Sequence, residues 1–219
     1  MKLFWLFLIA GSLISSAFSQ AAVQDDEDFQ SWNDVQINVA LSKKVDYFNK
    51  VTMRIGNDIS TLRDGRFAVG LVWKPTKALS ISPFFLYIKA RNTAGQFRIE
   101  NRLNLSATYR FPIKQFGLSH RSTYERRVRR PVNTWRYRGQ ISVEKDIPKT
   151  IIEGAKVFVS DEIFYDSRVK KFTRNRFSIG VSKTISKKLG VDLYYTRQND
   201  GFSHPGDLNI IWLAWKIKL

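Results

Sequence analysis

Apolar and polar side chains alternate along most of this chain, in segments of about ten residues separated by short polar stretches with glycine, proline or serine. Successive side chains of a β-strand point to opposite faces, whereas helical faces repeat every ~3.6 residues. Strict alternation therefore predicts a β-strand at Glu100–Phe111. One face carries Leu103, Leu105, Ala107, Tyr109 and Phe111, and the other carries Glu100, Arg102, Asn104, Ser106, Thr108 and Arg110.

The same alternation predicts a series of hairpins, because turn-forming stretches separate the alternating segments. The other predicted strands span 32–42, 47–57, 67–73, 79–89, 116–127, 135–144, 156–166, 174–184, 191–198 and 209–219. Segment 79–89 is apolar on both faces, so its pattern does not orient it. Bacterial single-chain barrels have even strand numbers, so these eleven segments leave both ten and twelve strands open.

The last segment, Asn209–Leu219, ends the chain with an apolar stripe that contains Ile211, Leu213, Trp215 and Ile217. The termini of soluble proteins are usually polar and frayed. An apolar terminal strand is typical of a bacterial outer-membrane barrel, in which it closes the sheet within lipid. The pattern therefore predicts an all-β fold: a closed antiparallel transmembrane-type β-barrel of about 10–12 strands, over residues 31–219.

The first 19 residues resemble a secretory signal peptide. Lys2 supplies the positive start, an apolar run covers Leu3–Ile14, and small residues place cleavage after residue 19 or as late as residue 21. The run is too short to span a bilayer, and an uncleaved anchor or a buried helix is the alternative. A short acidic segment, residues 20–30, then precedes the barrel. We therefore expect export to the bacterial outer membrane.

The expected connections alternate in length. Short turns are expected at Lys43–Asp46, Pro75–Lys77, Pro112–Gln115 and Ser186–Gly190, and longer loops at Arg91–Gln96, Val128–Thr134, Ser167–Phe172 and Asn199–Asp207. Lys145–Gly154 is the exception, a long stretch where a short turn is due. Transmembrane barrels have short periplasmic turns and longer extracellular loops. Interfacial girdles are predicted from aromatic residues near strand ends, although a soluble β-protein core would also use them: Tyr47, Phe48, Trp73, Tyr109, Phe111 and Trp135.

Composition restricts the partners. The chain has 36 Lys and Arg against 19 Asp and Glu, a net charge of +17, and no cysteine. In an exported protein we expect no nucleic acid partner, so this excess indicates outer-membrane lipids, lipopolysaccharide phosphates and small anions. Without cysteine there is no disulfide or thiolate chemistry. His120 and His204 do not have the spacing of a metal site, and we expect no cofactor.

Charged side chains of both signs share the inward faces of the predicted strands, and we expect them to form a charge network in the lumen. Paired across strands, they would fill a small lumen and stiffen its wall. The alternative is that the surplus arginines line a passage for anions. The residues are Arg54, Glu100, Arg102, Arg110, Arg121, Glu125, Arg127, Arg136, Arg138, Glu144, Arg174 and Arg176.

His120 and Ser122 are out of place, because they share a face with the apolar residues of predicted strand 116–127. A His-x-Ser pair on a barrel wall resembles the arrangement of outer-membrane lipid A deacylases, in which histidine activates serine against an acyl ester. Such chemistry needs an orienting acid, and the candidates Glu125 and Glu144 face inward and fit poorly. A bulge or a shift in register would explain the pair without catalysis.

Four segments resemble, in their order along the chain, a bacterial family known only as domain of unknown function 2490. They are Phe29–Val35, Asn101–Leu103, His120–Arg127 and Asp161–Tyr165. The resemblance covers Gln30–Leu219. Members of that family are taken to be exported, outer-membrane-type β-barrels, so the resemblance implies this fold. It implies no established activity, cofactor or catalytic residue.

Three hypotheses of function follow, and they leave the oligomeric state open. The first is a non-enzymatic outer-membrane barrel, either structural or a narrow anion-leaning channel. The second is an outer-membrane acyl hydrolase that uses His120 and Ser122. The third is a soluble periplasmic β-protein that binds anionic polymers. Dependence on detergent separates the third from the others, and ester hydrolysis separates the second.

Overall fold

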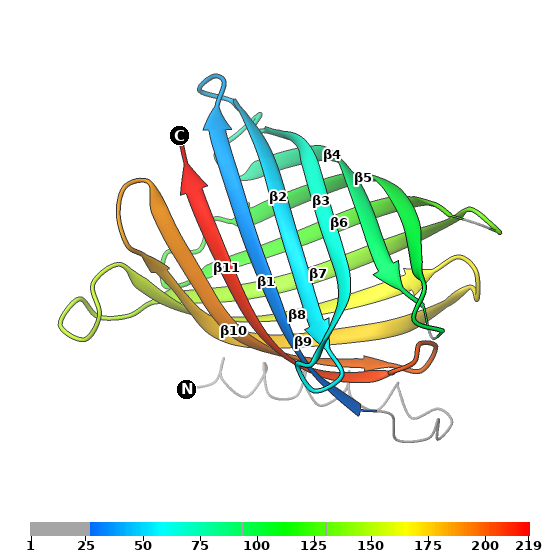
Figure 1. Ribbon diagram of the computed structural model, residues 1–219. Helices are drawn as coiled ribbons and strands as arrows, with labels where there is room; N and C mark the ends of the chain where they lie inside the picture. Colours follow the sequence, from blue (N-terminus) through cyan, green and yellow to red (C-terminus); the bar gives the residue numbers. More distant parts are fainter. Residues whose placement is uncertain (1–26, 93, 130) are drawn as a thin grey trace.

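The computed structural model describes residues 27–92, 94–129 and 131–219, so the expected signal peptide and residues 20–26 of the acidic segment lie outside the described residues. Eleven strands form one closed barrel (Figure 1). Within the described residues, no helix is long and apolar enough to cross a membrane. The strands are β1 (Glu27–Ala40), β2 (Val45–Gly56), β3 (Thr61–Trp73), β4 (Leu79–Arg91), β5 (Phe97–Phe111), β6 (Gly117–Val128), β7 (Thr134–Asp146), β8 (Ala155–Asp166), β9 (Lys171–Thr184), β10 (Leu189–Asp200) and β11 (Asp207–Lys218).

The barrel closes through a parallel seam. Strands that follow one another in the chain pair antiparallel, whereas β1 and β11 pair parallel, from Glu27 opposite Asp207 to Asn38 opposite Lys218. Direction alternates along the chain, so an odd number of strands leaves the first and last strands running the same way. The predicted all-β closed barrel of about 10–12 strands is confirmed. Its wholly antiparallel closure is wrong, and the count is eleven instead of ten or twelve.

The sequence located every strand but misplaced several ends. β3 begins at Thr61, well before the expected residue 67, and continues past a bulge in its pairing with β2 at Arg54 and Ile55. β9 begins at Lys171 and β10 runs to Asp200, which shortens two expected loops. The expected contrast between short turns at one end of the barrel and longer loops at the other is therefore wrong. The stretch between β7 and β8 is long, as expected. We call the end where β1 begins the N-terminal rim and the end where β11 stops the C-terminal rim.

Side chains alternate between the lumen and the outer wall. On β5, Leu103 and Leu105 are 58% and 53% exposed on the outside, whereas Asn104 and Ser106 are buried in the lumen. β4, which the pattern could not orient, turns Phe84 and Ile88 inward. Gly70 of β3 lies opposite Phe84, and any side chain at Gly70 would overlap it. The glycine therefore lets the Phe84 ring cross the neighbouring strand.

Aromatic rings form a belt on the outer wall towards the N-terminal rim. Consecutive centroids of this aromatic belt lie 5.9, 5.5 and 5.5 Å apart, in the order Tyr124, Trp135, Tyr165 and Phe172. Near the C-terminal rim, Tyr109 and Phe111 form an outward pair with centroids 5.1 Å apart. Phe48 was expected in a girdle, but it is buried in the lumen 5.9 Å from Phe84. That expectation is wrong because Phe48 shares its strand face with buried Thr52 and Arg54.

Candidate functional site in the barrel lumen

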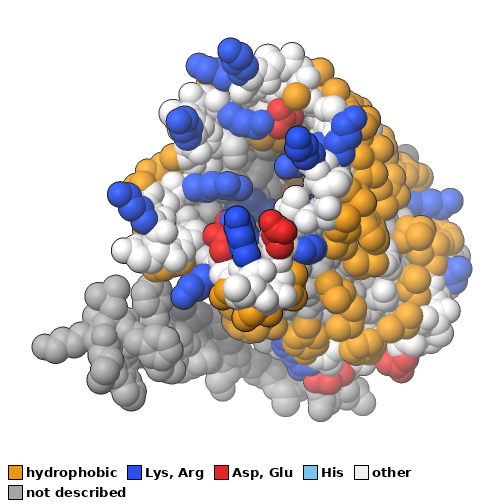
Figure 2. Space-filling model, turned by 90° about the vertical axis from the view of Figure 1, so that its left-hand side faces the viewer, with side chains coloured by type: hydrophobic (Ala, Val, Ile, Leu, Met, Phe, Trp, Pro, Cys, Tyr) orange, Lys and Arg blue, Asp and Glu red, His pale blue; other side chains and the backbone are white. Residues whose placement is uncertain are grey.

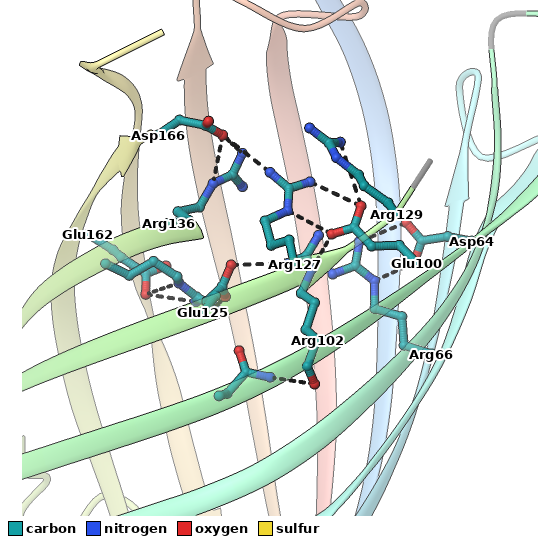
Figure 3. Close-up of polar contacts among 12 residues, drawn as sticks. Asp64, Arg66, Glu100, Arg102, Glu125, Arg127, Arg129, Arg136, Glu162 and Asp166 are labelled. Carbon is teal, nitrogen blue, oxygen red and sulfur yellow. Dashed lines mark hydrogen bonds and ion pairs between the residues drawn. The ribbon is translucent and has the colours of Figure 1, made fainter. Parts of the chain in front are cut away.

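Ion pairs join side chains on the lumen side of the four neighbouring strands β5 to β8 (Figure 3). We call this set the lumen network. β5 and β6 each carry one acid and one arginine of the network, β7 carries two arginines and β8 two acids, so each charge lies opposite or diagonal to one of the other sign. Its members are Glu100, Arg102, Glu125, Arg127, Arg136, Arg138, Glu162 and Asp166.

Glu125 lies between two arginines in the middle of the network. Its carboxylate oxygens lie 3.3 Å from Nη1 of Arg102 and 2.8 Å from Nη1 of Arg138. Arg138 also reaches Glu162 from Nη2, again at 2.8 Å. Glu125 is only 1% exposed. A carboxylate that is so deeply buried requires partners, because an isolated buried charge costs several kcal/mol.

A second branch of the network approaches the N-terminal rim. Arg127 contacts Glu100 from Nε at 2.6 Å and Asp166 from Nη1 at 3.2 Å. Arg136 contacts the same Asp166 from Nη2 at 2.7 Å, and Arg129 approaches Glu100 at 3.6 Å. Arginine is suited to this arrangement, because its planar fork can contact two carboxylates at once.

Two aromatic side chains fill the space beside the network. Trp32 of β1 and Phe164 of β8 are 1% and 2% exposed, and both point inward. The guanidinium carbon of Arg176 lies 4.9 Å from the ring centroid of each. Arg54 lies 3.2 Å from the Trp32 centroid. Cations over aromatic faces are stabilised by the ring quadrupole, so these side chains pack as a filled layer across the lumen.

The structure places the remaining predicted network residues in different surroundings. Arg121 approaches Glu162 at 3.4 Å from the C-terminal side, and Arg174 pairs with Asp200 near the N-terminal rim. Glu144 lies outside the network, near the C-terminal rim, where it contacts Lys156 at 3.1 Å. Its expected partnership with the arginines is therefore wrong, since residue 144 stands at the end of β7.

Several lumen residues were missed by the sequence analysis. Asp64 and Arg66 fell between the predicted strands 47–57 and 67–73. Asp166 and Asp200 lie at strand ends that the pattern placed imprecisely. Glu162 points inward and directly follows Asp161, which points outward. Two consecutive acids therefore obscured the alternation of polar and apolar residues there. A usable signal existed for Trp32: it shares its strand face with Asp34 and Gln36, so the pattern places it inward.

A basic hollow lies at the C-terminal rim. It has a volume of about 640 Å³, and its charged lining is Lys43, Lys44, Lys74, Lys77 and Arg110. The residues that line it, all within the described part of the chain, include no carboxylate. Figure 2 shows a hollow at this rim with many Lys and Arg and a few Asp and Glu side chains around it, and hydrophobic side chains along the outer wall. We call this hollow the basic mouth.

Most lysine side chains gather at the C-terminal rim of the barrel. The strand ends and connections at the C-terminal rim hold Lys43, Lys44, Lys74, Lys77, Lys114, Lys145, Lys149, Lys156, Lys183, Lys187, Lys188, Lys216 and Lys218. The arginines of the lumen network lie deeper. This division follows their chemistry, because the strongly hydrated ammonium favours a wet rim and the weakly hydrated guanidinium tolerates a drier interior.

A smaller cavity of about 190 Å³ lies between the network and the C-terminal rim. Arg121, Arg138 and Arg176 line it together with Glu162 and Asp192. The lumen therefore combines a filled, ion-paired layer with a polar, partly empty half that approaches the C-terminal rim.

His120 and Ser122 point outward, away from the lumen. His120 Nε2 lies 2.9 Å from Ser122 Oγ, which lies 3.0 Å from the hydroxyl of Tyr137. The two candidate acids, Glu125 and Glu144, occupy inward positions, as the sequence indicated. Within the described residues, no group of three or more His, Cys, Asp or Glu side chains could hold a metal ion.

Eleven strands in a closed barrel, with charged side chains in the lumen, define a closed β-barrel protein. The chain belongs to the family "Protein of unknown function (DUF2490)", whose model matches residues 29–209. No curated protein matches the chain.

Solved structures similar to this chain include two porins. One, titled "NanC porin structure in rhombohedral crystal form", has 11% identity and a TM-score of 0.51, covering 83% of this chain and 93% of that one. Another, "Anion-selective porin from Comamonas acidovorans", has 10% identity and a TM-score of 0.37, covering 76% of this chain. This chain spans 54% of that second porin's length. At such low identity the first likeness shows the fold alone.

Proposed function

We propose that this protein is an outer-membrane barrel without enzymatic activity, whose lumen forms a narrow, anion-leaning conduit. The basic mouth is the observation that carries the proposal: four lysines and one arginine line it, and of these Lys74 is paired with the neighbouring carboxylate of Asp46. Fixed positive charge in a narrow tube with low-dielectric walls raises the local anion concentration. The lumen network then restricts the conduit, because it fills the next layer with paired side chains.

The outer wall supports a membrane location. Its strands present large exposed apolar side chains, such as Leu103, Leu105, Ile141 and Leu193. Outward apolar positions that alternate with polar lumen positions are the pattern of membrane barrels. A soluble periplasmic protein with this surface would be prone to aggregation.

Ion current through planar bilayers tests the conduit. We expect the purified barrel to show small conductance with a reversal potential that favours anions. A triple variant of the mouth, Lys43→Gln with Lys44→Gln and Lys77→Gln, should shift this potential towards cations. The matched control is Lys114→Gln with Lys149→Gln and Lys187→Gln, which removes the same charge from the same rim outside the mouth.

Equal shifts in the two triple variants would mean that the mouth does not set selectivity. Absence of any current in the folded protein would leave a structural barrel, contrary to the proposal. The hydrolase alternative rests on the contact between His120 and Ser122, and its test is separate. Release of fatty acid from phospholipid or lipid A by the wild type, and its loss in Ser122→Ala, would contradict the non-enzymatic part.

A further inference from the structure

A group of polar side chains lies on the outer wall among apolar neighbours. We call it the polar patch: His120 and Ser122 of β6, Tyr137 of β7, Asp161 of β8 and Asn175 of β9. These five positions alternate with buried lumen residues such as Thr123, Glu162 and Arg176, so they point outward.

The register brings the patch together. His120 pairs with Ile141, which pairs with Asp161, so the histidine and the carboxylate flank Ile141 in one row. In the next row, Ser122 pairs with Gly139. The Tyr137 hydroxyl lies over Gly139, 3.3 Å from where a methyl group would stand. The glycine therefore gives Tyr137 room to reach Ser122.

The patch lies on the apolar side of the aromatic belt. His120 is four residues from Tyr124 on its strand, and Asp161 is four residues from Tyr165 on its own. Aromatic belts mark the boundary between headgroups and hydrocarbon. If the barrel spans the membrane as proposed above, a carboxylate, an imidazole and two hydroxyls would face hydrocarbon. Such groups are costly there and usually meet a polar partner.

We propose that the polar patch is a contact surface for a second copy of this chain. Asp161 provides an acceptor, with Asn175 Nδ2 donating to one of its oxygens at 2.7 Å. His120 and Tyr137 provide donors on the other side of Ile141. A two-fold axis along the membrane normal through the Ile141 column sets β6 of each copy opposite β8 of its partner. Each copy then brings His120 to the side on which its partner presents Asp161, so donors of one copy meet the acceptor side of the other and the surface is complementary to itself.

The absence of cysteine from the chain makes disulfide trapping specific. Ile141→Cys places a thiol on the inferred axis, and Leu193→Cys on β10 is the matched control, since both side chains are 55% exposed on the outer wall. In outer membranes treated with a mild oxidant, we expect a disulfide-linked dimer from Ile141→Cys and monomer from Leu193→Cys.

Charge exchange tests the chemistry of the contact. In the Ile141→Cys background, Asp161→Asn should reduce the trapped dimer by about fivefold. The exchange variant, His120→Asp with Asp161→His, should restore the trapped dimer. Each contact across the two-fold axis would again join one histidine to one aspartate. Unboiled gel migration reports folding in every variant.

Three results would overturn the inference. They are equal trapping at residues 141 and 193, a trapped product whose mass differs from two copies, and no effect of Asp161→Asn on a folded barrel. The inference depends on the proposed membrane location, and recovery of the wild type without detergent would refute that location. Failure of trapping in a detergent-dependent barrel would refute the second-copy contact alone.

Discussion

The guanidinium carbon of Arg54 lies 3.2 Å from the centroid of the Trp32 ring, inside the barrel. The two residues belong to neighbouring strands and are paired directly in register. The stack therefore places a cation and a buried tryptophan on the wall facing the network. It contributes packing and cation–π attraction to the filled layer.

Trp32→Ala should destabilise the barrel by ~3–5 kcal/mol, because it removes a large, fully buried side chain and leaves a cavity. Urea unfolding of the protein in lipid vesicles measures the loss, and bilayer recordings of the same sample should show increased conductance. Trp73→Ala is the control, because Trp73 lies on the outer wall and is 48% exposed. Equal losses in the two variants would contradict the packing of Trp32 in the lumen.

Arg138→Gln should cost up to ~3–5 kcal/mol, since it leaves Glu125 and Glu162 buried without one of their partners. The double variant with Glu125→Gln should cost less than the sum of the two single variants, and a double-mutant cycle measures the difference. Lys156→Gln is the matched control: its pair with Glu144 is more than 40% exposed on both sides, so its loss should stay below ~1 kcal/mol. Additive effects of Arg138 and Glu125 would count against their coupling.

Alternation along single strands predicted the barrel, because a half-polar, half-apolar strand has only one way to face lipid and lumen. The alternation also predicted that Arg102, Glu125 and Arg138 point inward. It did not predict all carboxylate partners of the arginines, since Asp166, the partner of Arg136, and Asp200, the partner of Arg174, lie at strand ends where the period is lost. Whether β1 and β11 pair parallel or antiparallel depends on whether the strand count is odd or even. An error of one strand in the count therefore predicts the wrong direction of pairing.

Deleting Ile217–Leu219 should prevent folding, because these residues complete the seam with β1. Leu219 donates its backbone N–H to the carbonyl of Asn38 at 2.9 Å, and Ile217 lies opposite Ile37. Unsatisfied backbone groups within lipid cost several kcal/mol each. We expect loss of the form that migrates differently before boiling, and periplasmic degradation. Ile217→Ala retains the backbone and should fold; if the deletion folds equally well, the seam is not needed for closure.

Leu105→Lys should strongly impair insertion, and it tests whether the outer wall faces lipid. Leu105 lies midway along β5 and is 53% exposed on the outside, so a lysine there would enter hydrocarbon at a cost of ~2–4 kcal/mol. Leu41→Lys is the control, because Leu41 is 60% exposed in the connection after β1 and its ammonium would remain in water. Outer-membrane fractionation with detergent extraction measures the folded yield of each variant. A soluble periplasmic barrel would accept both lysines about equally, because its outer wall would already be hydrated.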